Sequence, residues 1–162
     1  MESQAAVKRA YARLGRLTPI KADCGKLCGK RCCKGGDDQG MILFPGEEKP
    51  PGPFTVYDRD INGYPVRFTV CKGWCKRDAR PLSCRIFPFA PYLSADGAIT
   101  IIPDPRARYV CPLLAEDAQP YIDQRFLNAV GDAFNELSEA AGMRPMLEAY
   151  AKMLDEYKRF TG

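Results

Sequence analysis

The sequence has 162 residues, of which 46% are hydrophobic and 27% are charged, with a formal net charge of +4. This length is typical of one folded domain with its own core, and the composition excludes a wholly disordered chain. The sequence contains no run of about 18 apolar residues, so we expect no membrane-spanning helix. The first 17 residues lack the apolar centre of a secretory signal, and we therefore predict a cytoplasmic protein whose thiols are kept reduced.

The charge is unevenly distributed along the chain. Residues 1–113 carry 19 basic and 11 acidic side chains, a balance of +8, whereas residues 114–162 carry 5 basic and 9 acidic side chains, a balance of −4. The basic residues of the first part lie between cysteines and do not form a continuous stripe. A nucleic-acid partner is therefore not expected.

The first predicted element is an amphipathic helix over residues 2–16. Its apolar side chains recur at spacings of three and four, with basic side chains on the other side. The apolar positions are Val7, Ala10, Tyr11, Leu14 and Leu17. The helix is expected to end before Pro19, because the residue preceding a proline avoids the α region.

A cysteine-rich run, CGKLCGKRCC, follows the helix from Cys24 to Cys33. Residues 34–53 then read as a loop rich in Gly, Asp and Pro, with one apolar island at residues 41–44. Glu47 and Glu48 lie in the segment FPGEE, which is typical of a β-turn. We expect both carboxylates to be solvated.

Two β-hairpins are predicted next. FTVYDRDI and YPVRFTVC flank Asn62-Gly63, a pair suited to the positive φ angles of a tight hairpin turn. The second strand delivers Cys71 at its end. The segment PYLSADGAITII is expected to form the other hairpin, with its turn at Asp96-Gly97.

Two helices are predicted at the end of the chain, over residues 119–141 and 144–160, with a break at Gly142. Their apolar stripes are typical of core packing. We therefore expect an α+β fold with a small Cys-rich β-hairpin centre, loops organised by metal, one N-terminal helix and a C-terminal helical hairpin. The chain is predicted to be a single domain over residues 1–162, with a metal-binding portion at 20–111 and the helical hairpin at 119–160.

The most informative composition feature is eight cysteines with no histidine. The absence of histidine excludes Ser-His and Cys-His catalytic pairs and mixed Cys-His zinc sites. Thiolates alone select zinc or iron–sulfur clusters. The predicted metal ligands are Cys24, Cys28, Cys32, Cys33, Cys71, Cys75, Cys84 and Cys111. The predicted cofactor is an iron–sulfur cluster, [4Fe–4S] in preference, or zinc.

The spacing of the thiols leaves their partition open. Adjacent side chains such as Cys32 and Cys33 rarely converge on one small tetrahedral ion, so the two can serve different metals, or one can be surplus. Glycines follow Cys24 and Cys28, and Gly73 lies between Cys71 and Cys75. Glycine tolerates positive φ, which lets the backbone fold back toward a sulfur.

Arg80 and Arg85 flank Cys84 in RDARPLSCRIF, and we assign both as candidate cofactor-binding residues. Guanidinium groups stabilise thiolates by charge, and they also bind carboxylates and phosphates bidentately. The first role implies hydrogen bonds to the metal site or to backbone carbonyls. The second implies an anionic small molecule or protein partner beside the metal.

The cysteine pattern resembles the CxxCxxCC (YkgJ-like) family of zinc- or iron-chelating cysteine-cluster proteins. The resemblance covers roughly residues 20–111: a run ending in CC, then CKGWC, then RPLSCRIF. The gaps in the first run are three residues long, where the family motif has two. The resemblance implies metal chelation. A related cluster in flagellin lysine methylases offers a weaker analogy to an iron–sulfur enzyme.

Three classes of function stay open at this point: a metal-handling protein, an iron–sulfur-dependent redox or radical enzyme that modifies other proteins, and a zinc-stapled interaction module. The radical-enzyme spacing C-x₃-C-x₂-C is absent, because Cys24, Cys28 and Cys32 give C-x₃-C-x₃-C. No Gly-rich nucleotide loop is present either.

Overall fold

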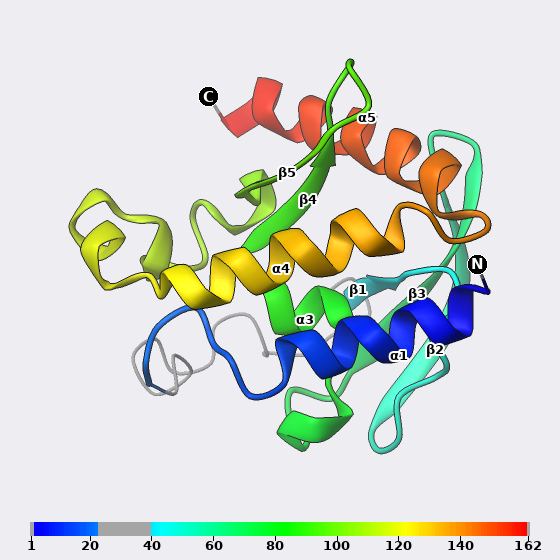
Figure 1. The fold of residues 1–162 in the computed structure, drawn as a ribbon, viewed down its shortest axis with the longest axis horizontal. Helices are drawn as coiled ribbons and strands as arrows, with labels where there is room; N and C mark the ends of the chain where they lie inside the picture. Colours follow the sequence, from blue (N-terminus) through cyan, green and yellow to red (C-terminus); the bar gives the residue numbers. More distant parts are fainter. Residues whose placement is uncertain (1, 23–39, 162) are drawn as a thin grey trace.

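A computed structural model describes residues 2–22 and 40–161. The fold is α+β, with an N-terminal helix, small antiparallel sheets and two C-terminal helices (Figure 1). The helices are α1 (Ser3–Leu14), α3 (Leu82–Ile86), α4 (Gln124–Leu137) and α5 (Met143–Thr161). None of the helices in these described ranges could cross a membrane.

The first sheet has three antiparallel strands in the order β1-β3-β2. These strands are β1 (Gly40–Leu43), β2 (Phe54–Ile61) and β3 (Tyr64–Cys71). The predicted hairpin is confirmed: Ile61 pairs with Tyr64, and Asn62 and Gly63 have φ angles of 51° and 84°. Asn and Gly tolerate this left-handed region better than other residues, which explains why the turn is readable from local sequence.

The strand β1 was missed, because residues 34–53 were interpreted as a loop. Gly40 pairs with Val70, and Leu43 pairs with Arg67. A Cβ atom at Gly40 would lie 2.3 Å from the carbonyl oxygen of Thr69, so glycine is required where β1 meets β3. The apolar island at residues 41–44 is therefore a short strand whose partner is distant in sequence.

The second sheet contains β4 (Phe89–Leu93) and β5 (Ile99–Pro103), as the second hairpin prediction required. Its turn is wider than the two-residue turn expected at Asp96-Gly97. The amide of Ser94 donates to the carbonyl of Ala98, and the amide of Gly97 donates to the carbonyl of Ser94. Of the two predicted turn residues, only Gly97 adopts a positive φ, of 87°.

Both C-terminal helices are present, but α4 begins five residues later than predicted. Residues Glu116–Tyr121 form a 3-10 helix that contains Pro120, and the side chain of Asp123 then caps α4 by accepting from the amide of Arg125. Gly142, at a φ of 77°, separates α4 from α5. Pro145 lies in the first turn of α5, where a missing N–H costs little.

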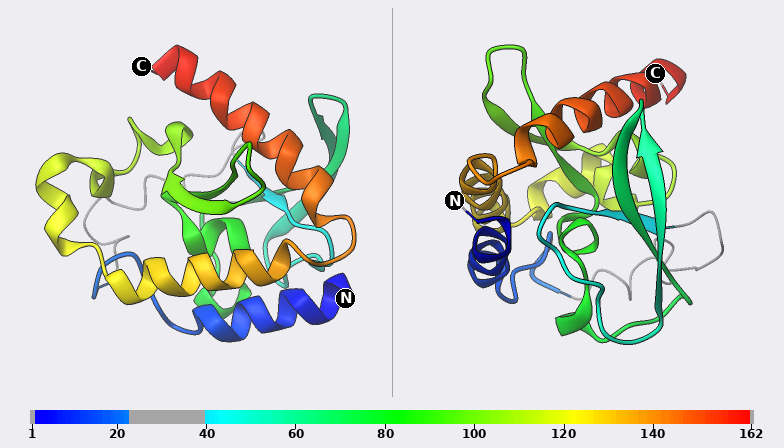
Figure 2. Two further views of the ribbon diagram at one scale, coloured as in Figure 1. Left: turned by 45° about the horizontal axis from the view of Figure 1, so that its top comes forward. Right: turned by 90° about the vertical axis from the view of Figure 1, so that its right-hand side faces the viewer.

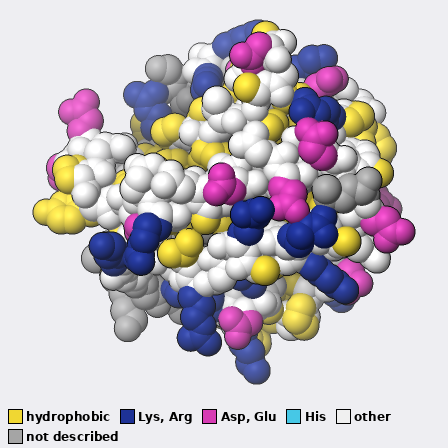
Figure 3. All heavy atoms as spheres, in the orientation of Figure 1, with side chains coloured by type: hydrophobic (Ala, Val, Ile, Leu, Met, Phe, Trp, Pro, Cys, Tyr) yellow, Lys and Arg dark blue, Asp and Glu magenta, His cyan; other side chains and the backbone are white. Residues whose placement is uncertain are grey.

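Helix α1 packs antiparallel along α4 (Figures 1 and 2). Arg9 and Arg13 of α1 both donate to the carboxylate of Glu136 on α4, Arg13 at 2.9 Å. Basic and acidic side chains accordingly lie side by side over the α1 and α4 face in Figure 3. The basic first part of the chain and the acidic last part meet at this helix pair.

The core lies between these helices and the sheets. Phe44, which follows β1, is fully buried and packs edge-on against Phe134 of α4 at 5.1 Å and Tyr150 of α5 at 6.1 Å between ring centroids. One cluster of buried apolar side chains joins α1, β1, α3, β4, α4 and α5. A single residue after a four-residue strand thus connects the sheet to both C-terminal helices.

The first testable prediction concerns Glu136. Its hydrogen bonds to Arg9 and then to Arg13 lower the pKa of its carboxyl group below the ordinary value. A lowered folded-state pKa contributes stability above the unfolded-state pKa of about 4.3, and that stability is lost as the pH falls through the folded-state pKa. Glu136→Gln should therefore reduce the free energy of unfolding at pH 7, and the difference from the wild type should shrink progressively below about pH 4.3.

Urea denaturation over a pH series measures this difference. Glu148→Gln, at an exposed position of α5, is the control and should show no such trend. An effect of Glu136→Gln that is equal at pH 7 and pH 3 would contradict the electrostatic account of the α1–α4 contact.

Candidate functional site

Four of the eight predicted ligands, Cys24, Cys28, Cys32 and Cys33, lie outside the described residues. The other four are each half-buried. Cys71 is the last residue of β3, Cys84 is in α3, and Cys111 precedes the 3-10 helix Pro112–Leu114. Cys75 follows Cys71 after Gly73, whose φ of 91° matches the positive φ expected for a glycine between these thiols.

The described cysteines do not form a complete metal site by themselves. Among residues 2–22 and 40–161, no group of three or more Cys, Asp or Glu side chains is placed to hold a metal ion. Thiols are nevertheless the donors that zinc and iron–sulfur clusters take. The donor chemistry therefore suits zinc or iron–sulfur, but the described half of the set is not sufficient.

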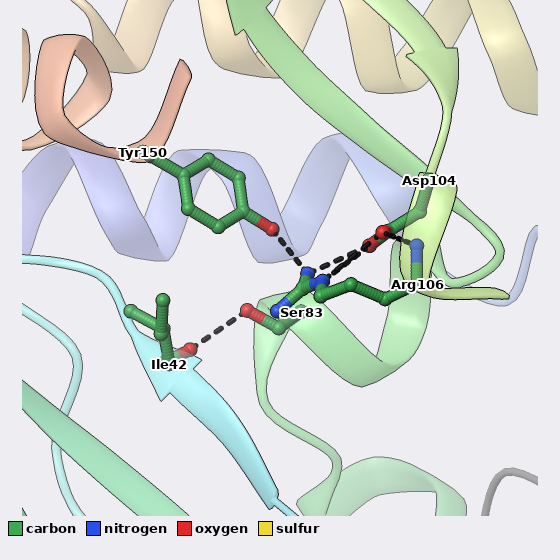
Figure 4. Close-up of polar contacts among 5 residues, drawn as sticks. All are labelled: Ile42, Ser83, Asp104, Arg106 and Tyr150. Atoms are coloured by element: carbon green, nitrogen blue, oxygen red, sulfur yellow. Dashed lines mark hydrogen bonds and ion pairs between the residues drawn. The ribbon is translucent and has the colours of Figure 1, made fainter. Parts of the chain in front are cut away.

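Cys84 owes its position to the way α3 is anchored. Leu82, Ser83 and Ile86 form the buried side of this five-residue helix, which leaves Cys84 and Arg85 on the half-buried side. The hydroxyl of Ser83 donates to the carbonyl of Ile42 in β1 at 2.7 Å, as Figure 4 shows. Helix α3 is thus fixed to the strand that the sequence did not reveal.

Glu47 provides the strongest anchor of α3, and its predicted solvation was wrong. Only 2% of Glu47 is exposed. Its Oε1 accepts from the hydroxyl of Tyr11 at 2.5 Å and from the amide of Leu82 at 2.9 Å. Its Oε2 accepts from the amide of Phe44 at 2.6 Å. One carboxyl group therefore joins α1, the end of β1 and the first residue of α3.

The turn before Glu47 explains how a residue of FPGEE becomes buried. The amide of Glu47 donates to the carbonyl of Phe44 at 3.0 Å, which closes a turn through Pro45 and Gly46. Gly46 has a φ of 91°, and a Cβ atom there would lie 2.6 Å from the backbone of Ser3. The turn was read correctly from sequence, but α1 covers it and directs Glu47 inward.

Burial raises the pKa of the Glu47 carboxyl, while the hydrogen bonds from Leu82, Tyr11 and Phe44 act against that rise. Burial, followed by the neighbouring Glu47, also raises the pKa of the Tyr11 hydroxyl. The guanidinium of Arg67 donates to the main-chain carbonyl of Glu47. Glu47 therefore accepts from residues of α1, α3 and β3 and from Phe44, which follows β1.

Arg85 binds backbone carbonyls, as the structural interpretation required. Its Nε donates to the carbonyl of Arg80 at 2.8 Å, and its Nη2 donates to the carbonyl of Asp78 at 2.9 Å. The guanidinium also stacks over the ring of Tyr11, 4.6 Å from its centroid. Arg80 is half-buried, and its carbonyl ties the two predicted arginines together.

A second polar group, missed in the sequence, lies between β5 and α5. Arg106 binds Asp104 through several hydrogen bonds, the shortest from Nη2 at 2.6 Å, and the same Nη2 donates to the hydroxyl of Tyr150 at 2.6 Å (Figure 4). Asp104 and Tyr150 are 1% and 2% exposed, and burial raises the pKa of Tyr150 to about 12. PDPRAR gave no periodic signal that could have located this group.

The network of Asp104, Arg106 and Tyr150 fixes the segment that leads to Cys111. The amide of Cys111 donates to the carbonyl of Ala107, the last residue of the 3-10 helix Pro105–Ala107. Cys84 and Cys111 therefore each follow a segment that a buried carboxylate holds. Leu82, two residues before Cys84, donates its amide to Glu47. Asp104, seven residues before Cys111, binds Arg106.

Comparisons of the chain with protein-family models, with curated proteins and with solved structures found no match.

The second prediction concerns Glu47. Replacing one carboxylate oxygen with an amide group in Glu47→Gln sets an N–H donor against the donors of Tyr11, Leu82 or Phe44. A buried donor that loses its acceptor costs about 1–3 kcal/mol, so the free energy of unfolding should fall by about that amount. Chemical denaturation measures the change, and Glu48→Gln at the exposed neighbouring position is the matched control, expected to have little effect. Equal effects of the two substitutions would contradict the burial of Glu47.

The third prediction concerns Arg85. Arg85→Lys keeps the charge but loses the planar fork that reaches two carbonyls at once. The free energy of unfolding should fall by about 1–2 kcal/mol, because net hydrogen bonds of charged donors are lost. Arg77→Lys, at an exposed position of the preceding 3-10 turn, should be close to neutral. An unchanged stability of Arg85→Lys would show that charge alone accounts for Arg85.

Proposed function

We propose that the protein binds a metal centre through cysteine thiolates, as an iron–sulfur cluster or as zinc. The ligands are drawn from Cys24, Cys28, Cys32, Cys33, Cys71, Cys75, Cys84 and Cys111. An iron–sulfur cluster is favoured, because clustered thiols that include an adjacent pair suit a multi-iron centre better than a single ion. The proposal rests on the sequence, supported by the positions of the described cysteines.

The observation that carries the proposal is the pairing of Gly40 with Val70. Gly40 is the first described residue after the run CGKLCGKRCC, and Val70 immediately precedes Cys71. Seven residue steps separate Cys33 from Gly40 in the sequence. The chain that follows the first cysteine group therefore joins the sheet beside the first cysteine of the second group.

The other end of the run is also attached to the folded part of the chain. The carbonyl of Pro19 accepts from the amide of Asp123 at 2.7 Å, just before α4. Ile20 is buried, and Cys24 is only four residues further along. The described residues on both sides of the run are thus held by the core, which reduces the entropy lost when the run closes on a metal.

The arrangement of the described thiols also says what a complete site needs. Since no three potential ligands gather within residues 2–22 and 40–161, a four-thiolate site must take cysteines from the Cys24–Cys33 run. We propose that the described cysteines supply the remaining ligands, so that one centre uses both groups; a site formed by the Cys24–Cys33 run alone is the alternative partition, and it would make Cys84 dispensable for metal. When bound, the metal would supply an electron carrier as iron–sulfur or a rigid cross-link as zinc.

Two alternatives keep the same ligands but differ in outcome. An iron–sulfur-dependent redox or radical enzyme would need the cluster to change oxidation state, and a zinc-stapled interaction module would need only the fold around the metal. Within the first alternative, an anionic small molecule or a protein partner would bind near Arg80 and Arg85. We place the protein in the cytoplasm, where reducing conditions keep the thiols available.

The fourth prediction tests metal binding and its dependence on both groups. Protein purified without oxygen should contain iron with acid-labile sulfide, or zinc, in amounts stoichiometric with the chain. Cys84→Ser and Cys32→Ser should each lose most of that metal, because a hydroxyl is a poor substitute for a thiolate. Elemental analysis, together with the visible absorption of iron–sulfur centres, measures the loss.

Circular dichroism provides the folding control. The long helices α1, α4 and α5 contain no cysteine, so their signal should persist in both variants. A wild-type chain without stoichiometric metal would refute the proposed function. Loss of metal from Cys84→Ser but not from Cys32→Ser would show that the first group does not contribute through Cys32.

A further inference from the structure

The contact between Tyr11 and Glu47 has a feature that structural anchoring alone does not require. Both partners are ionisable, and their oxygens lie 2.5 Å apart. A carboxyl and a phenol at this distance can share a proton, with the phenol donating when the carboxylate is ionised and the carboxylic acid donating when it is protonated. The pair can therefore exist in two hydrogen-bonding arrangements without moving any backbone.

Solvent can reach this pair through Tyr11. A depression of about 330 Å³ opens beside α1, and its lining includes Tyr11, Gly46, Arg80 and Arg85. Glu47 is not part of that lining and is 2% exposed. Tyr11 therefore contacts both the open depression and, through its hydroxyl, the buried carboxyl group.

The charged and titratable groups around Glu47 come from each element packed on it. Tyr11 of α1 donates to the Glu47 carboxyl group, and Arg67 of β3 donates to the main-chain carbonyl of Glu47. Arg85 of α3 stacks over the ring of Tyr11. Burial favours the neutral Glu47 acid and raises its pKa, while the Arg67 charge favours the ionised carboxylate, and the Arg85 charge acts to lower the pKa of Tyr11. These opposing effects are the condition under which a carboxyl group responds to modest changes of pH.

We propose that Tyr11 and Glu47 form a proton-binding switch that controls how α3 is held against α1 and β1. The Glu47 carboxylate takes up one proton from solvent and becomes a neutral acid. Its bonds to the amides of Leu82 and Phe44 then change from charge-assisted to neutral hydrogen bonds, which are roughly half as strong. The hydrogen bonds from Phe44 and from the first residue of α3 are therefore stronger when Glu47 is ionised, whereas burial disfavours the ionised form.

The sign of the pH effect on global stability is distinct from this local effect. A carboxyl with a raised folded-state pKa contributes stability that is fully present below the unfolded-state pKa and is lost as the pH rises through the folded-state pKa. Acidification to about pH 4.3 should thus favour the folded state at Glu47, whereas the contribution of Glu136 is lost only as the pH falls below that value. The switch does not depend on the proposed metal, because none of its residues is a cysteine.

Nuclear magnetic resonance of the purified full chain tests the proposal. We expect the Glu47 carboxyl carbon to titrate with a midpoint above that of Glu48, the exposed neighbour. The amide resonances of Leu82 and Phe44 should shift with the Glu47 midpoint, and the amide of an exposed residue such as Asp96 should not. Equal midpoints for Glu47 and Glu48, or amide shifts that do not follow Glu47, would overturn the proposal.

The variant Tyr11→Phe separates a shared proton from simple burial. It keeps the aromatic ring but removes the hydroxyl that stabilises the ionised carboxylate, so the Glu47 midpoint should rise further. The control Tyr64→Phe removes a hydroxyl that donates to the carbonyl of Gly142, and it should leave the Glu47 midpoint unchanged. An unchanged Glu47 midpoint in Tyr11→Phe would overturn the role of Tyr11.

Discussion

The buried carboxyl group of Glu47 is the constraint on which the arrangement of the described chain most depends. It binds the hydroxyl of Tyr11 and the amides of Phe44 and Leu82. Tyr11 lies within α1, Phe44 follows β1 and Leu82 begins α3, and the two buried amides would otherwise each have an unmet hydrogen bond. The carboxyl group therefore adds one shared polar contact to the apolar core that α1, β1 and α3 form together.

The bonds of Glu47 also set the position of α3, the helix that carries Cys84. Helix α3 is too short to be stable alone, and its position is set by Glu47, by the bond from Ser83 to Ile42 and by the burial of Leu82 and Ile86. Cys84 and Arg85 consequently occupy a fixed, half-buried side. The network of Asp104, Arg106 and Tyr150 does the same for the segment before Cys111. Two buried carboxylates, from loops, thus orient two of the proposed ligands.

The parts of this fold that follow from local chemistry were predictable from the sequence. Asn62-Gly63 prescribes its turn by its own φ preferences, and the stripes of α1, α4 and α5 repeat with the helical period. The predicted start of α4 was wrong, because residues Glu116–Tyr121, which contain Pro120, form a 3-10 helix and the α-helix begins only at Gln124. Local sequence preferences therefore predict that these elements exist, but they do not locate every end.

The strand β1 and the burial of Glu47 could not be predicted in this way. Pairing of Gly40 with Val70 spans 30 positions of sequence, and the partners of Glu47 come from residues 11, 44 and 82. A glutamate in a Pro-Gly turn is usually solvated, and only the packing of α1 over Gly46 reverses that expectation. The roles proposed for the cysteines follow from residue chemistry, which the sequence shows without any tertiary information.

X-ray absorption at the metal edge of protein isolated without oxygen tests the central claim most directly, because it reports the atoms bound to the metal. The account predicts a first shell made of sulfur, at about 2.3 Å for zinc or for the iron of a cluster, with no need for a nitrogen shell in a chain that lacks histidine. A shell of nitrogen or oxygen near 2.0–2.1 Å would contradict it. Protein that holds no metal after such isolation would contradict it as well.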